Sequence, residues 1–140
     1  PGAAQNYSAA IINHMNQLAD KGRKKDALSA GLRGISLLQR RGGRNKTLVQ
    51  NYWAHVYEHV ETQLKANALK EAQRALHALD RRWVPSIRSH QQNYANLDSL
   101  IYQQRGQFQN CILTLKRVSR RNTASWMSDR MRRCQAKQRR

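Results

Sequence analysis

The sequence predicts an all-α protein, a solenoid of three helix pairs followed by a C-terminal capping helix. Only two prolines, Pro1 and Pro85, occur in 140 residues, and Ala, Leu, Gln and Arg, which favour helices, are abundant. Apolar residues recur at helical spacing, and one pattern of turn and small residues occurs three times. A chain of this length is expected to form a single domain, residues 1–140.

The repeated pattern is centred on a turn residue that tolerates a left-handed backbone: Gly22, Asn67 and Gly106. Five residues after each turn comes a small residue that would let the preceding helix approach closely: Ala27, Ala72 and Cys111. Further core positions on the second helices follow at helical spacing: Gly31, Leu76 and Leu115, then Gly34, Leu79 and Val118. Repeats are therefore expected over about residues 7–40, 47–82 and 86–122.

The first helix of each pair carries an apolar stripe before its turn. The stripe residues are Tyr7, Ile11, Met15 and Leu18 in the first copy, then Tyr52, Val56 and Val60 in the second. The third copy is weaker at these offsets, with Ala95, Ser99 and Tyr102. Each stripe is expected to lie on one face of its helix and to be buried.

A final helix is expected over about residues 124–138. One stripe would contain Trp126, Met127, Met131 and Cys134, and the largely opposite face Arg130, Arg132, Arg133 and Lys137. Repeat proteins need such a helix to cover the last repeat. The alternative is a basic amphipathic helix that binds an anionic membrane surface.

The third copy, "YQQRGQFQNCILTLKRV", resembles the tetratricopeptide repeat, with Gly106, Phe108 and Cys111 where that family prefers Gly, an aromatic residue and Ala. The resemblance covers about residues 7–122, although the turns are 45 and 39 residues apart rather than about 34. It implies a peptide-binding groove lined by the first helices, for which the candidates are Asn16, Tyr57 and Asn96. A carboxylate clamp is not supported, because Ile12 stands where the family would need Lys.

The stretch "WAHVYEHVETQ", residues 53–63, contains the zinc-peptidase spacing H-x-x-E-H in His55, Glu58 and His59. Such enzymes need a third protein ligand, and the acidic residues after Glu61 form no second motif. Repeat register explains His59, because His14, His59 and Asp98 all stand eight residues before a turn. We interpret the motif as a coincidence. No metal, cofactor or catalytic residue is predicted, and the chain is expected not to be an enzyme, since it also has no phosphate-binding Gly-rich loop.

The chain is strongly basic, with 26 Lys and Arg against 8 Asp and Glu and a net charge of +18. Half of this charge lies in residues 116–140. An Arg pair is expected to end each second helix: Arg40–Arg41, Arg81–Arg82 and Arg120–Arg121. The pairs would either compensate the helix dipoles as solvated ends or form an anion-binding ridge along one edge. Both interpretations stay open at this point.

Two cysteines, Cys111 and Cys134, allow one disulfide or none. A bond would favour the periplasm or envelope, and reduced cysteines the cytoplasm. The chain begins at Pro1 without Met, which indicates either a processed protein or a fragment. No stretch is long and apolar enough to predict a transmembrane segment.

The leading functional hypothesis is a non-catalytic tetratricopeptide-like adaptor or scaffold that binds an acidic protein or peptide within a larger bacterial assembly. The alternative is a helical repeat that binds nucleic acid through its backbone, using the Arg pairs. Aromatic residues are scarce at 6%, and none is interleaved with the Arg pairs for base stacking. An anionic envelope component, lipid or glycan, is a third partner class that the charge allows.

Overall fold

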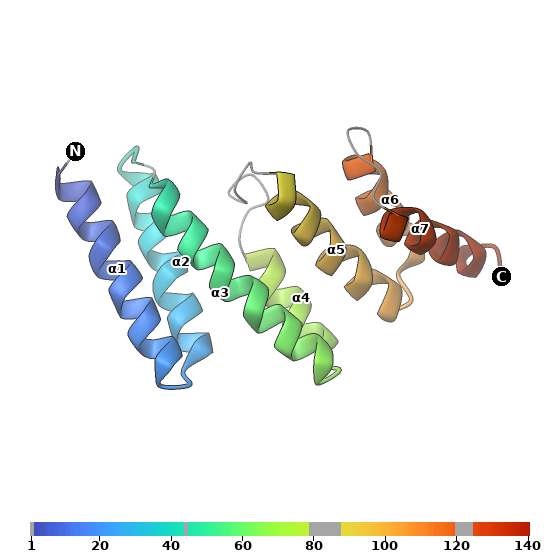
Figure 1. Ribbon diagram of the computed structural model, residues 1–140, viewed down its shortest axis with the longest axis horizontal. Helices are drawn as coiled ribbons and strands as arrows, with labels where there is room; N and C mark the ends of the chain where they lie inside the picture. The colour runs from blue at the N-terminus through green and yellow to red at the C-terminus, as the bar shows by residue number, and fades with distance from the viewer. Residues whose placement is uncertain (1, 44, 79–87, 120–124) are drawn as a thin grey trace. The chain divides into compact units, whose positions relative to one another are not determined.

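The computed structural model describes residues 2–43, 45–78, 88–119 and 125–140. Within these residues the chain is entirely helical apart from short turns, which confirms the all-α prediction (Figure 1). The helices are α1 (Gly2–Asp20), α2 (Lys24–Arg40), α3 (Lys46–Lys65), α4 (Leu69–Ala78), α5 (Arg88–Gln104), α6 (Phe108–Ser119) and α7 (Ser125–Gln138).

The helices belong to two compact units, whose boundary lies inside α3, between His59 and Val60. Unit 1 contains α1, α2 and most of α3, and unit 2 contains the end of α3 and α4 to α7. The boundaries of the predicted repeats, by contrast, lie between one helix pair and the next. A single domain over residues 1–140 stays a prediction.

Three turns, α1–α2, α3–α4 and α5–α6, share one backbone geometry. Gly22, Asn67 and Gly106 all adopt a left-handed conformation, with φ of 75°, 57° and 74°. In each turn the amide of the residue after the left-handed one donates to a carbonyl five residues earlier, over 2.8–2.9 Å. This is the Schellman arrangement, which satisfies carbonyls that a helix end would otherwise leave unpaired. The left-handed turns predicted from the sequence are confirmed.

The small residues five positions after each turn are fully buried, as predicted: Ala27, Ala72 and Cys111. In unit 1 the approach is closest at Gly31. A Cβ atom built there would overlap the Met15 sulfur of α1 and lie 2.7 Å from the Tyr52 ring of α3. A Cβ at Gly34 would lie 3.0 Å from Ile11. These two glycines therefore allow α2 to pack directly on α1.

The stripes on the first helices are largely buried where the sequence placed them. Met15, Tyr52, Val56 and Val60 are inaccessible or nearly so. The stripe of the third copy is also buried, although its residues are small: neither Ala95 nor Ser99 has any exposed surface. The α3 helix begins after Asn45, whose Oδ1 accepts a hydrogen bond from the Leu48 amide at 2.9 Å.

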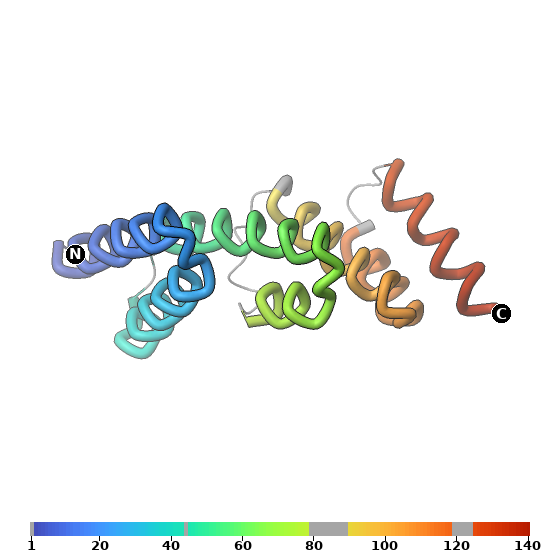
Figure 2. The backbone as a smooth tube through the Cα atoms, turned by 90° about the horizontal axis from the view of Figure 1, so that it is seen from below, coloured from blue at the N-terminus to red at the C-terminus, as the bar shows by residue number. Residues whose placement is uncertain are grey.

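The core of unit 2 continues through α6 into α7. Its buried residues at this end are Cys111, Ile112, Leu115, Met127 and Cys134, with Trp126 and Met131 packed against them. Figures 1 and 2 show α7 beside α6, and the two helices are in contact. The apolar stripe predicted for the last helix is thus the face that covers α6.

Candidate functional site

The predicted anion-binding residues are only partly within the described chain. Arg40 ends α2, and Arg41 is its C-cap, so this pair does stand at a helix C-terminus. Both side chains are exposed. The other predicted members, Arg81, Arg82, Arg120 and Arg121, lie outside the described residues.

Arg40 also borders a shallow depression on the outward face of α2. The depression is lined by Ser29, Leu32, Arg33, Ser36, Leu37 and Arg40. Leu37 is 40% exposed, which is unusual for a large apolar side chain in this protein. We refer to these six residues as the α2 outer face. Sequence reasoning missed it, although two leucines and two arginines alternate there with serines at helical spacing.

The predicted groove residues fall in different units and already have partners inside the protein. Asn16 and Tyr57 belong to unit 1, and Asn96 belongs to unit 2. Asn16 accepts a hydrogen bond from His55, and the ring of Tyr57 makes an edge contact with that of Trp53. Asn96 accepts hydrogen bonds from Arg130. These bonds have a structural role within each unit.

His55 of the H-x-x-E-H stretch joins three helices. Its Nδ1 lies 2.8 Å from Lys24 Nζ on α2, and its Nε2 lies 2.8 Å from Asn16 Oδ1 on α1. An ammonium group only donates, so Nδ1 accepts and the proton of the neutral ring sits on Nε2, which donates to Asn16. Burial lowers the pKa of His55, and the charge of Lys24 lowers it further. Glu58 and Asp20 oppose this shift.

The other two residues of that stretch have separate environments. Glu58 is exposed and pairs with Lys24 at 3.2 Å. His59 is buried. Of its two register equivalents, Asp98 is likewise buried, whereas His14 is exposed. Within the described residues no three His, Cys, Asp or Glu side chains are grouped closely enough to hold a metal ion.

Asp98 forms a hydrogen bond inside unit 2 that the sequence did not indicate. Its side chain is only 6% exposed, and its Oδ1 lies 2.6 Å from His77 Nε2 on α4. The His77 ring also lies 5.9 Å from the ring of Tyr102. A buried carboxylate needs such a partner, because an unpaired charge in the interior is strongly unfavourable. The pair links α4 to α5.

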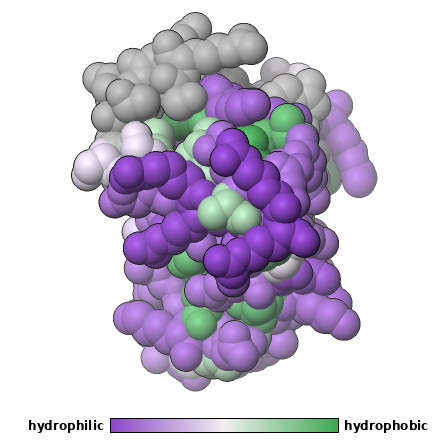
Figure 3. Space-filling model, turned by 90° about the vertical axis from the view of Figure 1, so that its right-hand side faces the viewer, coloured by the Kyte–Doolittle hydropathy of each residue, from purple (hydrophilic) through white to green (hydrophobic). Residues whose placement is uncertain are grey.

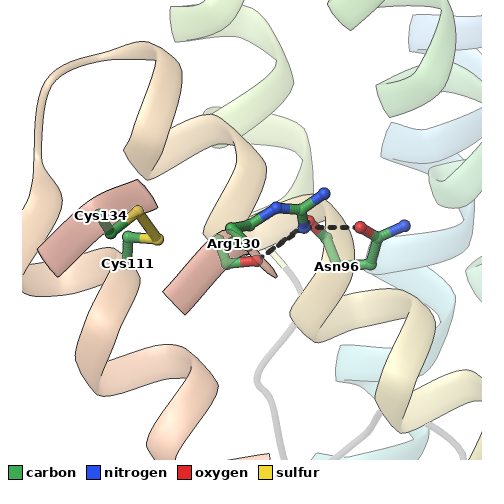
Figure 4. Close-up of a disulfide and its surroundings, with 5 residues drawn as sticks. Asn96, Cys111, Arg130 and Cys134 are labelled. Carbon is green, nitrogen blue, oxygen red and sulfur yellow. Dashed lines mark hydrogen bonds between the residues drawn. A yellow bond between two sulfur atoms is a disulfide. The ribbon is translucent and has the colours of Figure 1, made fainter. Parts of the chain in front are cut away.

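Arg130 corrects the prediction that it would lie on the outward face of α7. Figure 4 shows its side chain extending from α7 toward Asn96 on α5. One guanidinium nitrogen donates to the Asn96 carbonyl at 2.8 Å, to the Asn96 side-chain oxygen at 2.6 Å and to Ser99 Oγ at 3.0 Å. The guanidinium also lies 5.0 Å from the centre of the Trp126 ring. Burial lowers the pKa of Arg130. Helical geometry allows the inward position of Arg130, because residue 130 lies one turn after Trp126 and beside Met127 on the same helix.

The remaining cations of α7 do face solvent. Arg132, Arg133 and Lys137 are exposed, and Arg132 pairs with Asp129 on the same helix. Figure 3 shows a largely hydrophilic surface at this end, with small separated hydrophobic areas. The polar face expected of a terminal helix is therefore present, apart from Arg130.

The structure joins Cys111 on α6 to Cys134 on α7 in a disulfide, with 6.6 Å between their Cα atoms (Figure 4). Of the two alternatives that the sequence left open, this is the bonded one. Both cysteines are fully buried in the core between the two helices. Together with Arg130, the bond attaches α7 to both helices of the preceding pair.

The few carboxylates are mostly used within the protein. Among the described residues, four carboxylates form ion pairs, namely Asp26 with Arg23, Glu58 with Lys24, Glu71 with Arg74 and Asp129 with Arg132, and a fifth, Asp98, lies within hydrogen-bonding distance of His77. Many cations remain exposed, among them Arg33, Arg40, Arg41, Lys65, Lys70, Arg117, Arg133 and Lys137. The excess positive charge is therefore carried on the solvent-facing surface.

Comparison of the chain with protein-family models, with curated proteins and with solved structures finds no match in any of the three. The tetratricopeptide resemblance rests on the residues and turns described above. No helix in the described ranges combines the length and apolarity needed to cross a bilayer.

Proposed function

We propose that this chain is a non-catalytic, tetratricopeptide-like helical repeat that binds an acidic partner protein. The observation that carries the proposal is the imbalance of charge: five of the seven carboxylates in the described residues have partners within the protein, while many Lys and Arg side chains are exposed. A surface of this kind attracts anionic partners and speeds their association.

The repeat part of the proposal is supported by the three turns. Each has a left-handed residue at the same place, the same backbone hydrogen bonds and a buried small residue five positions later. Helical repeats of this type present side chains from successive helices to a protein partner. The spacing between turns is longer than the family norm, so the proposed resemblance concerns the helix pairs rather than their stacking.

Nucleic acid is the second candidate, favoured by the same exposed Lys and Arg side chains. The aromatic side chains argue against base recognition. Every aromatic residue within the described chain is buried or half-buried, so none is presented openly for stacking on bases. Binding of nucleic acid would therefore depend on phosphate contacts alone.

The proposal is tested by fluorescence anisotropy with three labelled probes: a Glu-rich peptide, random duplex DNA and single-stranded RNA. Nuclease-treated protein would be titrated at about 50 and 200 mM salt, since phosphate contacts weaken steeply over that range. We expect the peptide to bind and to retain measurable affinity at the higher salt. Nucleic-acid binding that persists at about 200 mM salt, with a far weaker peptide, would contradict the proposal.

A further inference from the structure

We propose that the α2 outer face is the surface on which an amphipathic acidic helix of the partner protein docks. This inference rests on the proposed function above and names the surface that would bind the acidic partner. The α2 outer face combines shape, exposed apolar area and unbalanced positive charge on one helix.

The hollow shape follows from residue size. Two rows of side chains run along α2 at four-residue spacing, one through Ser29, Arg33 and Leu37, the other through Leu32, Ser36 and Arg40. The serines are short, so the larger leucines and arginines stand around them and leave a depression between. A side chain from a partner helix would fit over these serines.

The apolar part of the α2 outer face is Leu37 together with the half-buried Leu32. Among the described residues, the only other large hydrophobic side chain of similar exposure is Leu113 on α6, at 42% against 40% for Leu37. A single exposed leucine is ordinary on a protein surface. Leu37 is of interest because it borders the depression that also contains Leu32.

Within the described residues, no carboxylate forms an ion pair with the two arginines of the α2 outer face. Arg33 and Arg40 are exposed, and the one acidic residue of α2, Asp26, is paired with Arg23 at 2.8 Å near the start of the helix. The two arginines are seven positions apart in the sequence, which places them about 10 Å apart along the helix axis. Glutamates two turns apart on a partner helix would match this spacing, and each could accept a bidentate guanidinium bond.

The opposite side of α2 is held firmly. Gly31 and Gly34 face Met15, Tyr52 and Ile11 at close range, so α2 is seated on α1 and α3 within unit 1. A rigid helix presents its outward side chains with little loss of conformational freedom on binding. The α2 outer face is thus pre-formed for the helix-in-groove mode of peptide recognition.

The test uses a fluorescein-labelled helical peptide of about 18 residues, with Leu on one face and Glu two turns apart beside it. Two variants remove the proposed contacts, Leu37→Ser and the double substitution Arg33→Glu with Arg40→Glu. Each has a matched control elsewhere: Leu113→Ser for the exposed leucine, and Lys65→Glu with Lys70→Glu for the same change of charge. All five proteins would be checked by thermal unfolding, and exposed positions are expected to leave the fold intact.

We expect the two α2 variants to weaken binding at least about tenfold, and the two controls about threefold or less. A Glu-rich peptide without leucine should bind more weakly than the amphipathic one. Equal losses in the α2 variants and their controls, or equal binding of the leucine-free peptide, would overturn the α2 outer face as the site while leaving acidic-protein binding in place. No binding of either peptide to the unaltered protein would contradict both proposals.

Discussion

Gly31 is the residue on which the contact of α1, α2 and α3 depends most directly, because any side chain there meets Met15 and Tyr52. Gly31→Ala should destabilise unit 1 by about 1–3 kcal/mol, since overpacking outweighs the gain in helix propensity of about 1 kcal/mol. Urea unfolding measures the change. Gly2→Ala is the control, because nothing lies within 4 Å of a Cβ at that position. A more stable Gly31→Ala protein would show that α1 and α2 approach less closely.

Arg130 has a structural role that depends on its hydrogen bonds. Arg130→Met keeps an apolar stem but removes the bonds to Asn96 and Ser99 and the contact with Trp126. The free energy of unfolding should fall by about 1.5–3 kcal/mol, the range for hydrogen bonds to a charged group. Arg133→Met, on the exposed side of the same helix, should change it by less than about 0.5 kcal/mol. Equal changes in the free energy of unfolding for Arg130→Met and Arg133→Met would indicate that Arg130 is exposed to solvent like Arg133.

His55 should make stability depend on pH. Its pKa is lowered in the folded protein by burial and by Lys24, so the unfolded chain takes up the proton first as the pH falls. The stabilisation from the neutral ring is complete above the unfolded pKa of about 6.5 and is lost as the pH falls below it. Comparing urea unfolding of the parent protein and His55→Gln between about pH 7.5 and pH 5 isolates this contribution. A parent protein that gains stability relative to His55→Gln toward pH 5 would contradict the assignment.

At the scale of helices, the covalent attachment of α7 to α6 should be measurable. The Cys111–Cys134 bond has a sequence separation of 23, and a loop of that size corresponds to roughly 3 kcal/mol of stabilisation. Reduction should lower the free energy of unfolding by about that amount and increase hydrogen exchange in α7. Exchange in α1, which belongs to the other unit, should not change. Free thiols in the freshly isolated, non-reduced protein would contradict the bonded state.

The same scale shows what the sequence could predict. Residue type alone predicts the backbone geometry of a turn, so a left-handed backbone could be predicted for Gly22, Asn67 and Gly106. The inward position of Arg130 could not be predicted this way, because charge favours the solvent face and the bonds that reverse this come from α5, about thirty residues earlier. The links of Lys24 to His55 and of His77 to Asp98 escaped prediction for the same reason.

The candidate site was predicted less completely than the fold. The place of Arg40 at a helix end is visible in the sequence, whereas its grouping with Leu32, Leu37 and the serines of the α2 outer face is not, because apolar periodicity identifies the buried face of a helix and not a depression on its exposed face. Asn16 and Asn96 were selected as polar groove residues, yet each accepts hydrogen bonds from a neighbouring helix. Composition and periodicity indicate which face of a helix is buried, whereas the pairing of polar side chains depends on which helices are in contact.

At the scale of the whole molecule, the net charge of +18 opposes folding through repulsion among exposed cations. Adding about 200 mM NaCl, which shortens the screening length to less than about 10 Å, should therefore raise the Tm. Exposed ion pairs lose strength under the same conditions, but each is worth little. The measurement is a thermal unfolding series in NaCl, with sucrose as an uncharged control for the solute. A Tm that falls with salt would mean that ion pairs outweigh repulsion.

The helices of each unit mostly contact neighbours in the chain, as α1 does with α2, α5 with α6, and α6 with α7. Proteins dominated by such local contacts fold quickly, on the order of microseconds to milliseconds, because little chain must be searched before each contact forms. A helix pair can therefore close soon after it leaves the ribosome. The final helix is the exception in timing, since Cys134 reaches Cys111 only after synthesis of the unit is nearly complete. Oxidation of the two thiols to the disulfide would therefore follow the docking of α7, which covers the apolar surface of α6.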